Sequence, residues 1–399
     1  MIRQFSWMFL GRIAAALLQF AGFALLVNWV APAEFGIIAS VLGTSAVIIA
    51  FLDFGISTHV LKTWALGSRG VEVKSALQLN NHITLGFGVL SSLIVIILAL
   101  SWNPFFWFLL PLVFWAAGEK NADTWLCVAI SAGRAEYNTF NLVGRRLLSL
   151  VIMALLMSVT DNGTLSYSLG VAFGAIASVF YAHRVVWPIV SRNMSGGFVS
   201  NREILRMARP FWVHSFATQV RNLDTLIVAM VASPLVAGFY GVASKLSGPL
   251  RMVPTSIAPV LIPVVVKEGI TRRLAGLLLG ILAALTIFYV ALAATAIYWV
   301  PFLFGSSYEP ALTAVQITCV GLSLGATASL LGACLQATGD QRYVAQTSVL
   351  ASVVCIPAII FGTFFAGSAG AAVGMISSFA IQSLLFTKLC VSRWRQNGH

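Results

Sequence analysis

Residues 210–263 read PFWVHSFATQVRNLDTLIVAMVASPLVAGFYGVASKLSGPLRMVPTSIAPVLIP. Most of this stretch is apolar enough to lie in a bilayer, yet it contains Arg221, Asp224, Lys245 and Arg251. A charge near the bilayer centre costs about 2.5–3.5 kcal/mol on insertion scales, so such residues usually face a partner or a wet cavity. The stretch therefore predicts a membrane protein with a polar interior.

The composition supports this class, because 59% of the 399 residues are hydrophobic and only 9% are charged. Apolar runs of helical length follow one another along the chain, so we expect no soluble domain. Their length also argues against an outer-membrane barrel, whose strands would show about 10 residues of alternating hydrophobicity. The first run continues to Val30 and leads into Pro32 and Glu34, so we expect a retained helix rather than a signal peptide.

We expect an all-α integral membrane protein with about 12 transmembrane helices in two six-helix lobes around a central cavity. The candidate spans are 5–30, 35–58, 79–100, 105–130, 138–159, 165–189, 210–232, 235–265, 274–299, 309–335, 343–365 and 369–390. The expected domains are an N-terminal lobe (1–190), a cytoplasmic linker (191–209) with a short amphipathic surface helix over 201–206, and a C-terminal lobe (210–399).

The loop charges predict the orientation. Alternate loops hold Lys and Arg, whereas the remaining loops hold only the acids Glu34, Asp161 and Glu309. The positive-inside rule then places both termini in the cytoplasm. It also accounts for much of the net charge of +12, so no nucleic-acid partner is needed.

The two halves contain weak internal matches. With an offset of 204, Ala33, Phe35, Ala39 and Ser40 align with Ala237, Phe239, Ala243 and Ser244, and with an offset of 206 Gly133 and Tyr137 align with Gly339 and Tyr343. Six helices per half give both halves the same orientation. This is the parallel-repeat design of transporters, with the substrate site between the halves.

Three cations and four acids are the candidate functional residues. Arg221 lies about 16 Å into its span, near the midplane, and Asp224 follows on the same helical face, where the two could instead form a structural pair. Lys245 has no acid three or four residues away, and Arg251 lies further along the same helix, which four prolines are expected to bend. Asp53, Glu119, Asp123 and Asp224 are candidates for ion coupling or charge balance. Snorkelling to the interface is the simpler explanation for one set of residues, Arg12, Asp53, Arg145, Arg146 and Arg184.

Motifs spread over the chain resemble those of a known family. They are Pro32-Ala33-Glu34-Phe35-Gly36, Leu52-Asp53-Phe54-Gly55-Ile56, Asn222-Leu223-Asp224-Thr225-Leu226-Ile227-Val228, Ala237-Gly238-Phe239-Tyr240-Gly241-Val242-Ala243, Phe304-Gly305-Ser306-Ser307-Tyr308 and Gln336-Ala337-Thr338-Gly339-Asp340. In these the chain resembles the oligosaccharide flippases (O-antigen and exopolysaccharide translocases) of the multidrug/oligosaccharidyl-lipid/polysaccharide exporter superfamily. With about 12 expected spans, we expect the chain to lack the two additional helices of lipid II flippases, which argues against a peptidoglycan precursor.

The resemblance implies transport of an undecaprenyl-pyrophosphate-linked oligosaccharide across the bacterial inner membrane, for lipopolysaccharide or exopolysaccharide synthesis, with membrane lipids and a polysaccharide polymerase complex as partners. The residue chemistry agrees, because cations in a low-dielectric cleft attract a pyrophosphate. Arg221, Lys245 and Arg251 would provide the cationic surface, and Asp224 would orient Arg221 or balance the empty site.

Three alternatives stay open. A drug or metabolite exporter of the same superfamily would favour carboxylates over cations. A membrane-embedded polysaccharide-processing enzyme would need catalytic residues near the surface, but the five histidines show no HExxH or similar spacing and the five cysteines no CxxC, so we expect no enzyme, cofactor or metal site. A purely structural protein would not need charges at the midplane.

Overall fold

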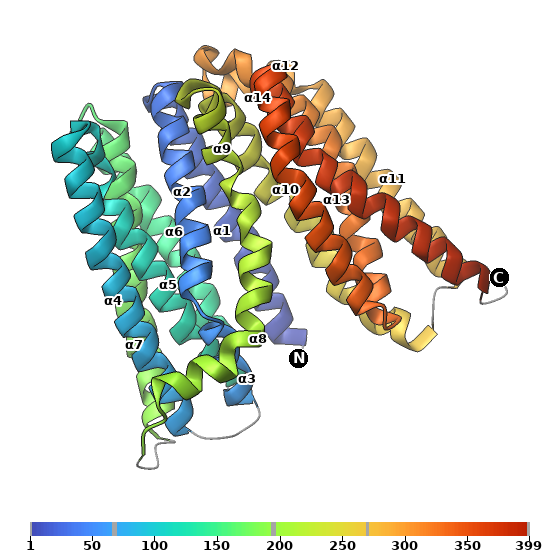
Figure 1. Cartoon of the computed structure of the whole chain (residues 1–399), viewed down its shortest axis with the longest axis horizontal. Helices are drawn as coiled ribbons and strands as arrows, with labels where there is room; N and C mark the ends of the chain where they lie inside the picture. Colours follow the sequence, from blue (N-terminus) through green and yellow to red (C-terminus); the bar gives the residue numbers. More distant parts are fainter. Residues whose placement is uncertain (1, 66–69, 193–196, 269–270, 397–399) are drawn as a thin grey trace. The chain divides into compact units, whose positions relative to one another are not determined.

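The computed structural model describes residues 2–65, 70–192, 197–268 and 271–396, and these residues form helices and no strand (Figure 1). The α-helices are α1 (Ile2–Trp29), α2 (Pro32–Leu52), α3 (Ile56–Ala65), α4 (Gly70–Ser101), α5 (Leu110–Ser131), α6 (Ala135–Met157), α7 (Gly163–Ser191), α8 (Asn201–Gln219), α9 (Asp224–Val231), α10 (Pro234–Glu268), α11 (Arg272–Ala294), α12 (Ala296–Phe304), α13 (Leu312–Ala337) and α14 (Gln341–Gln396). Three 3-10 helices, η1 (Pro104–Leu109), η2 (Val220–Leu223) and η3 (Ser306–Ala311), complete the order. The expected all-α fold class is confirmed.

Eight helices in the described part of the chain are long and apolar enough to cross a membrane. One of them, α14, contains two of the expected spans, because Ala366 and Gly367 leave the helical conformation in its middle. Helix α5 is absent from the eight, and its sequence holds three charged residues close together. The chain is a multi-pass membrane protein, and the count of twelve spans stays a prediction.

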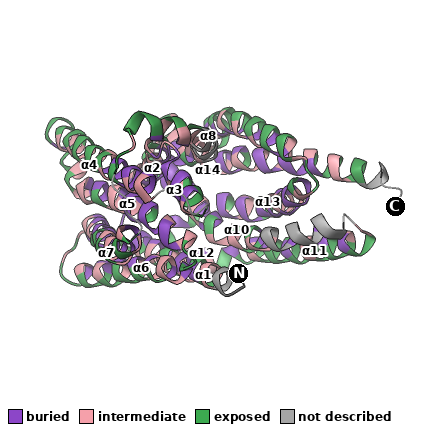
Figure 2. Ribbon diagram, turned by 90° about the horizontal axis from the view of Figure 1, so that it is seen from below, coloured by how far each residue is buried: buried purple, intermediate pink, exposed green. Residues whose placement is uncertain are grey.

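Large apolar side chains cover outward faces of several spans. On α4, Leu85, Val89 and Leu93 are exposed, as are Leu279 and Ile287 on α11. Figure 2 shows exposed residues of α4 in green. Apolar surfaces of this extent suit hydrocarbon and are rare on water-soluble monomers. These faces are therefore expected to meet lipid.

The chain forms two compact units. Unit 1 comprises residues 1–30 and 44–219, and unit 2 comprises residues 31–43 and 220–399. Helix α2 thus begins in unit 2 and ends in unit 1. The expected lobe boundary at 191–209 stays a prediction.

Unit 1 is built around α5, which packs against α3, α4 and α7. Its largest core cluster includes Ile56, Leu77, Leu126 and Val186, all fully or almost fully buried. Ile204 of α8 also belongs to this cluster. The amphipathic helix expected on the membrane surface therefore places Ile204 against protein, and it continues past residue 206 to Gln219 as α8.

In unit 2 the start of α2 crosses the start of α10 at very close range. A Cβ atom on Gly36 would collide with the carbonyl oxygen of Pro234, and one on Gly238 would collide with the carbonyl oxygen of Pro32. Each helix therefore needs a glycine where the other helix begins. This reciprocal contact explains why two of the motifs contain a glycine at these positions.

The matched phenylalanines of the internal repeat also meet in unit 2. Phe35 and Phe239 both make edge-to-face contacts with Tyr308, with ring centroids 6.2 and 6.3 Å away. Phe35 and Tyr308 are each 1% exposed. The Pro-Ala-Glu-Phe-Gly and Phe-Gly-Ser-Ser-Tyr motifs thus belong to one packing unit.

Two expected helices are interrupted. The span predicted over 35–58 ends at Leu52, and α3 begins at Ile56 because Phe54 and Gly55 both adopt left-handed conformations, with φ of 46° and 77°. The span predicted over 210–232 is interrupted by η2 at Val220–Leu223. Both interruptions lie beside a candidate acid, Asp53 or Asp224.

Candidate functional site

The site in unit 2 begins with Asp224, the first residue of α9. Its carboxylate accepts hydrogen bonds from the backbone N–H of Thr225 (2.7 Å) and from the hydroxyls of Tyr240 and Ser244 (2.8 Å each). A negative side chain at a helix N-terminus is also favoured by the helix dipole. Asp224 is therefore stabilised by hydroxyl and amide donors, and no ion pair joins it to Arg221 within the described residues. The alternative of a structural Arg221–Asp224 pair is wrong because η2 breaks the helix between them.

Arg221 lies in that break and extends toward α14. Its Nε donates to Ser352 Oγ at 2.7 Å, and its Nη2 donates to the carbonyl oxygen of Ser348 at 3.1 Å. The guanidinium is thus held by neutral oxygens, which leave its positive charge uncompensated. The sequence alone could not predict these partners, because they lie 127 and 131 residues away along the chain.

Lys245 and Arg251 both project from α10. Lys245 is half-buried and makes no hydrogen bond or ion pair with any described side chain, although the charge of Asp224 acts on it. Arg251 lies with its guanidinium carbon 5.0 Å from the ring centroid of Phe379, a cation–π contact. The charge of Arg221 acts on Arg251, so these two cations share one region of unit 2.

Helix α10 is continuous from Pro234 to Glu268 despite its internal prolines. Pro254 has no N–H to donate to the carbonyl oxygen of Leu250. The hydroxyl of Tyr289 on α11 donates to that oxygen instead, at 2.9 Å. No proline ends α10, a neighbouring helix satisfies a freed carbonyl, and the expected bend stays a prediction.

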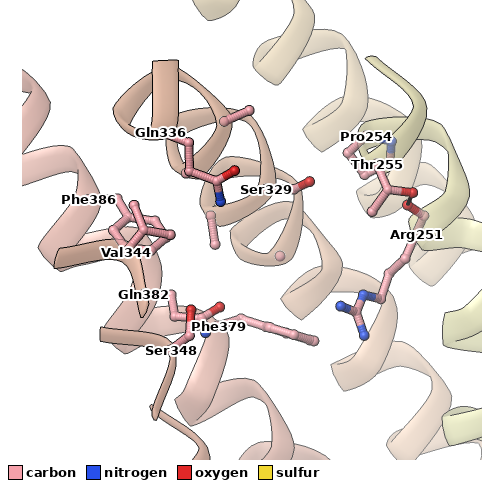
Figure 3. Close-up of a pocket in the computed structure, with 14 residues that line it drawn as sticks. Arg251, Pro254, Thr255, Ser329, Gln336, Val344, Ser348, Phe379, Gln382 and Phe386 are labelled. Atoms are coloured by element: carbon pink, nitrogen blue, oxygen red, sulfur yellow. Dashed lines mark hydrogen bonds between the residues drawn. The ribbon is translucent and has the colours of Figure 1, made fainter. Parts of the chain in front are cut away.

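A pocket of about 380 Å³ lies in front of Arg251 (Figure 3). Its lining combines this cation with polar side chains from α13 and α14, among them Gln336, Ser348 and Gln382, and with the rings of Phe379 and Phe386. Ser348 also supplies the carbonyl that binds Arg221, so the pocket adjoins the second cation. The arrangement offers a positive charge, hydrogen-bonding amides and aromatic faces within one concavity.

The pocket extends along α13 from Gln336, next to the end of the helix, to Gly325. That separation is about 16 Å along a helix. The following turn leads to Arg342 at the start of α14, and the positive-inside rule assigns this end of the helix to the cytoplasm. By this prediction the pocket begins at the cytoplasmic side and reaches toward the midplane.

The acids of unit 1 have cationic partners. Asp53 Oδ1 accepts from Lys120 Nζ at 2.5 Å and from Ser57 Oγ at 2.6 Å. Lys120 also donates to Asn80 Oδ1 at 3.1 Å and to Thr124 Oγ1 at 2.6 Å. The lysine is 8% exposed, so this is a buried ion pair supported by neutral hydrogen-bond partners.

Glu119 and Asp123 share two arginines of α6. Arg145 lies between them, 2.7 Å from Asp123 and 3.8 Å from Glu119, and Arg146 binds Glu119 at 2.7 Å. A cation from another helix therefore relieves the repulsion expected for two acids four residues apart. Snorkelling is the wrong explanation for Arg145 and Arg146, whose side chains are 5% and 13% exposed, and for the buried Asp53. It remains suitable for Arg12 and Arg184, which are exposed.

The structure thus separates the seven candidate residues into two sets. Arg221, Asp224, Lys245 and Arg251 lie in unit 2, and Asp53, Glu119 and Asp123 lie in unit 1. Sequence reasoning missed Tyr240 and Ser244, which share a face of α10 at a spacing of four residues and could have been found as a hydroxyl pair. It had no means of finding Ser348 and Ser352 as partners.

The chain matches no protein-family model and no curated protein. Solved structures with the same fold exist. One is a multidrug resistance MATE family transporter of the MOP superfamily in an inward-facing conformation, with a TM-score of 0.75, 13% identity, and coverage of 96% of either chain. Another is the lipid II flippase MurJ in an inward closed conformation, with a TM-score of 0.70, 13% identity, and coverage of 97% of this chain and 87% of MurJ.

The eukaryotic MATE transporter AtDTX14 is a third, with a TM-score of 0.70, 13% identity, and coverage of 98% and 95%. All three align over nearly the whole of this chain. At such low identity they establish the fold and leave the substrate open. The protein therefore has the helical fold that MATE transporters and the flippase MurJ share.

Proposed function

We propose that the protein is a flippase for an undecaprenyl-pyrophosphate-linked oligosaccharide, an O-antigen or exopolysaccharide repeat unit, in the bacterial inner membrane. The observation that carries the proposal is the excess of positive charge in unit 2. Arg221, Lys245 and Arg251 have no ion-pair partner among the described residues, whereas the acid Asp224 is held by hydroxyls. An anionic ligand would supply the missing counter-charge.

The pocket lining suits both parts of such a head group. A pyrophosphate accepts charge-assisted hydrogen bonds from guanidinium and ammonium groups, which are stronger than neutral ones. The sugar hydroxyls can bond to Gln336 and Gln382, and the sugar faces can pack on Phe379 or Phe386. The polyprenyl tail needs only hydrocarbon surroundings and can remain in the bilayer.

The resemblance of the motifs and the shared fold point to alternating access as the transport mode. The cations of unit 2 would contact the head group when it binds at the cytoplasmic side. After its release at the outer side, they would contact water instead. A polymerase complex would then receive the flipped repeat unit.

The test is a proteoliposome assay with a lipid-linked oligosaccharide labelled on its sugar, whose exposure to an external quencher is followed with time. Protein-dependent exposure should fall about tenfold in Arg251→Gln, which corresponds to about 1.4 kcal/mol of lost interaction. Arg393→Gln is the matched control, because Arg393 forms an exposed pair with Asp340. Equal rates for the wild type, Arg251→Gln and the triple variant of Arg221, Lys245 and Arg251 to Gln would refute the proposal.

A second candidate is a multidrug or metabolite exporter of the same superfamily. The observation in its favour is the fold match to the inward-facing MATE transporter, the highest TM-score of the three reported. Such a protein would bind cationic drugs, for which Asp224 is the only acid among the candidate charges of unit 2. Transport of cationic dyes by the same vesicles, abolished by Asp224→Asn and unaffected by Arg251→Gln, would favour this candidate.

A further inference from the structure

Unit 1 contains a lateral groove that the proposed function does not use. It has a volume of about 670 Å³ and lies between α4, α5 and α7. Leu85, Val89 and Leu93 form one wall at successive four-residue steps of α4, and Ile176 and Phe180 of α7 form the opposite wall. All five side chains are exposed, so the groove opens to the surroundings of the spans.

Small residues create the space. Gly88, Ala117 and Gly118 line the groove between its walls. A Cβ on Gly118 would lie 3.1 Å from the Cβ of Ala175, so α5 and α7 approach each other closely there. A Cβ on Gly88 would meet only Ala117, at 3.8 Å. The floor is therefore backbone and methyl groups, and Gly88 marks the point where a larger side chain would fill the groove.

One end of the groove is polar, and its hydrogen bonds define which atoms remain free. The indole N–H of Trp125 is only a donor, and it bonds to Asn81 Oδ1 at 2.9 Å. Asn121 Nδ2 bonds to the same oxygen at 2.8 Å. Asn81 is thereby oriented, and its Nδ2 has no hydrogen-bond partner among the described residues.

The same reasoning determines the state of His183. Because Asn121 Nδ2 is a donor, Asn121 Oδ1 is the acceptor in the 2.9 Å contact with His183 Nε2. In the neutral imidazole the proton then lies on Nε2, and Nδ1 is left as an acceptor. The ring is fixed by stacking on Trp125, with centroids 4.0 Å apart. The polar end thus presents one free donor, Asn81 Nδ2, and one free acceptor, His183 Nδ1.

The length of α4 places the polar end at the expected depth of a lipid's ester groups. Helix α4 has 32 residues and is about 48 Å long, which exceeds the ~30 Å hydrocarbon core. Its apolar exposed residues continue to Leu100, and exposed Trp102 follows as an interfacial anchor. About 20 residues of helix span the core, so counting back from Ser101 places the opposite boundary near Asn81.

The absence of charged side chains in the groove indicates which class of lipid suits it. The lining residues include no Lys, Arg, Asp or Glu. A prenyl pyrophosphate has no cation of its own and would call for Lys or Arg in the groove. The phosphate of a zwitterionic phospholipid is balanced by the ammonium of the same lipid, and its ester carbonyl needs only a neutral donor such as the Asn81 amide. An ethanolamine head group can in turn donate to His183 Nδ1. The apolar walls then accommodate an acyl chain that runs from Asn81 toward Leu93.

We propose that this groove is a binding site for a diacyl phospholipid of the ethanolamine class, with its ester carbonyl on Asn81 Nδ2 and one acyl chain along Leu85, Val89 and Leu93. All lining residues of the groove belong to unit 1, whereas the candidate cations belong to unit 2. The bound lipid would be a structural component of the transporter rather than its cargo.

The test is native mass spectrometry of the purified full chain after delipidation, with titration of three probes. These are a diester phosphatidylethanolamine, its diether analogue with equal chains, and undecaprenyl phosphate. The diester lipid should bind at least fivefold more tightly than the diether lipid, because the diether lacks the carbonyl acceptor.

A pair of glycine variants tests the location. Gly88→Leu places a side chain in the groove and should weaken binding of the diester lipid about tenfold. Gly86→Leu is the matched control on the same helix, because Gly86 does not line the groove and a Cβ there meets no atom within 4 Å. Equal affinity in the two variants would overturn the site, equal affinity for diester and diether would overturn the role of Asn81, and tighter binding of undecaprenyl phosphate would overturn the choice of lipid.

Discussion

Both units contain intramembrane charges, but they arrange them in opposite ways. In unit 1, Asp53 is paired with Lys120, and Glu119 and Asp123 are paired with Arg145 and Arg146 (these three acids and three cations form the balanced network). In unit 2, three cations accompany one acid, and no ion pair joins any of the four to another among the described residues (these four form the unbalanced set).

This difference indicates different roles. A buried charge without its partner is strongly destabilising, so a balanced network holds a fold together only while it is complete. Cations held by neutral oxygens or an aromatic face keep most of their attraction for an external anion. We therefore expect charge changes in unit 1 to affect stability and charge changes in unit 2 to affect transport. Lys120→Met and Lys245→Gln test this comparison directly, and Gly36→Ala and Tyr289→Phe measure how far unit 2 depends on packing and hydrogen bonds. The four are ordered from the largest expected loss of stability to the smallest.

Lys120→Met should lower the free energy of unfolding by about 3–5 kcal/mol, because it leaves Asp53 buried without a cation. Thermal unfolding in detergent, followed by size-exclusion fluorescence, measures the effect. The double variant with Asp53→Asn should recover most of the loss. Wild-type stability of the single variant would contradict the idea that unit 1 depends on its balanced network.

Gly36→Ala should cost about 1–3 kcal/mol through overpacking, because its Cβ would collide with the Pro234 carbonyl at the crossing of α2 and α10. Gly280→Ala on α11 is the control, since a Cβ there meets no atom within 4 Å, and it should be neutral or stabilising. The same melting assay compares the two. Similar melting temperatures for both variants would show that unit 2 tolerates separation of these helices.

Tyr289→Phe should cost about 1 kcal/mol, because the Leu250 carbonyl loses the donor that replaces the missing N–H of Pro254. Tyr298→Phe offers an exposed tyrosine as the control. Equal chemical-denaturation midpoints for the two variants would mean that α10 does not need this hydrogen bond.

Lys245→Gln should leave the protein at least as stable as the wild type, because it removes a half-buried cation that has no ion-pair partner among the described residues. Its effect should appear in the flipping rate of the proteoliposome assay, which we expect to fall about tenfold, or by about 1.4 kcal/mol. A loss of stability comparable to that of Lys120→Met, with unchanged flipping, would remove the distinction between the two units.

Several features were predictable from the sequence because they depend on local composition. The run of apolar segments determines an all-helical membrane protein, and charges within those segments mark a polar interior whatever the packing. The motif glycines and the matched Phe35 and Phe239 could also be found, because a close helix crossing demands the same small and aromatic residues in both helices.

Only the tertiary structure decided which charges have partners. Arg145 and Arg146 were expected at the interface, yet they lie between α5 and α6 because Glu119 and Asp123 face them there. Arg221 and Asp224 have a spacing that suits a pair, yet η2 turns Arg221 toward Ser348 and Ser352 of α14. Spacing along a helix determines which side chains share a face, whereas ion pairing depends on which other helix packs against that face, and that partner lies tens to more than a hundred residues away.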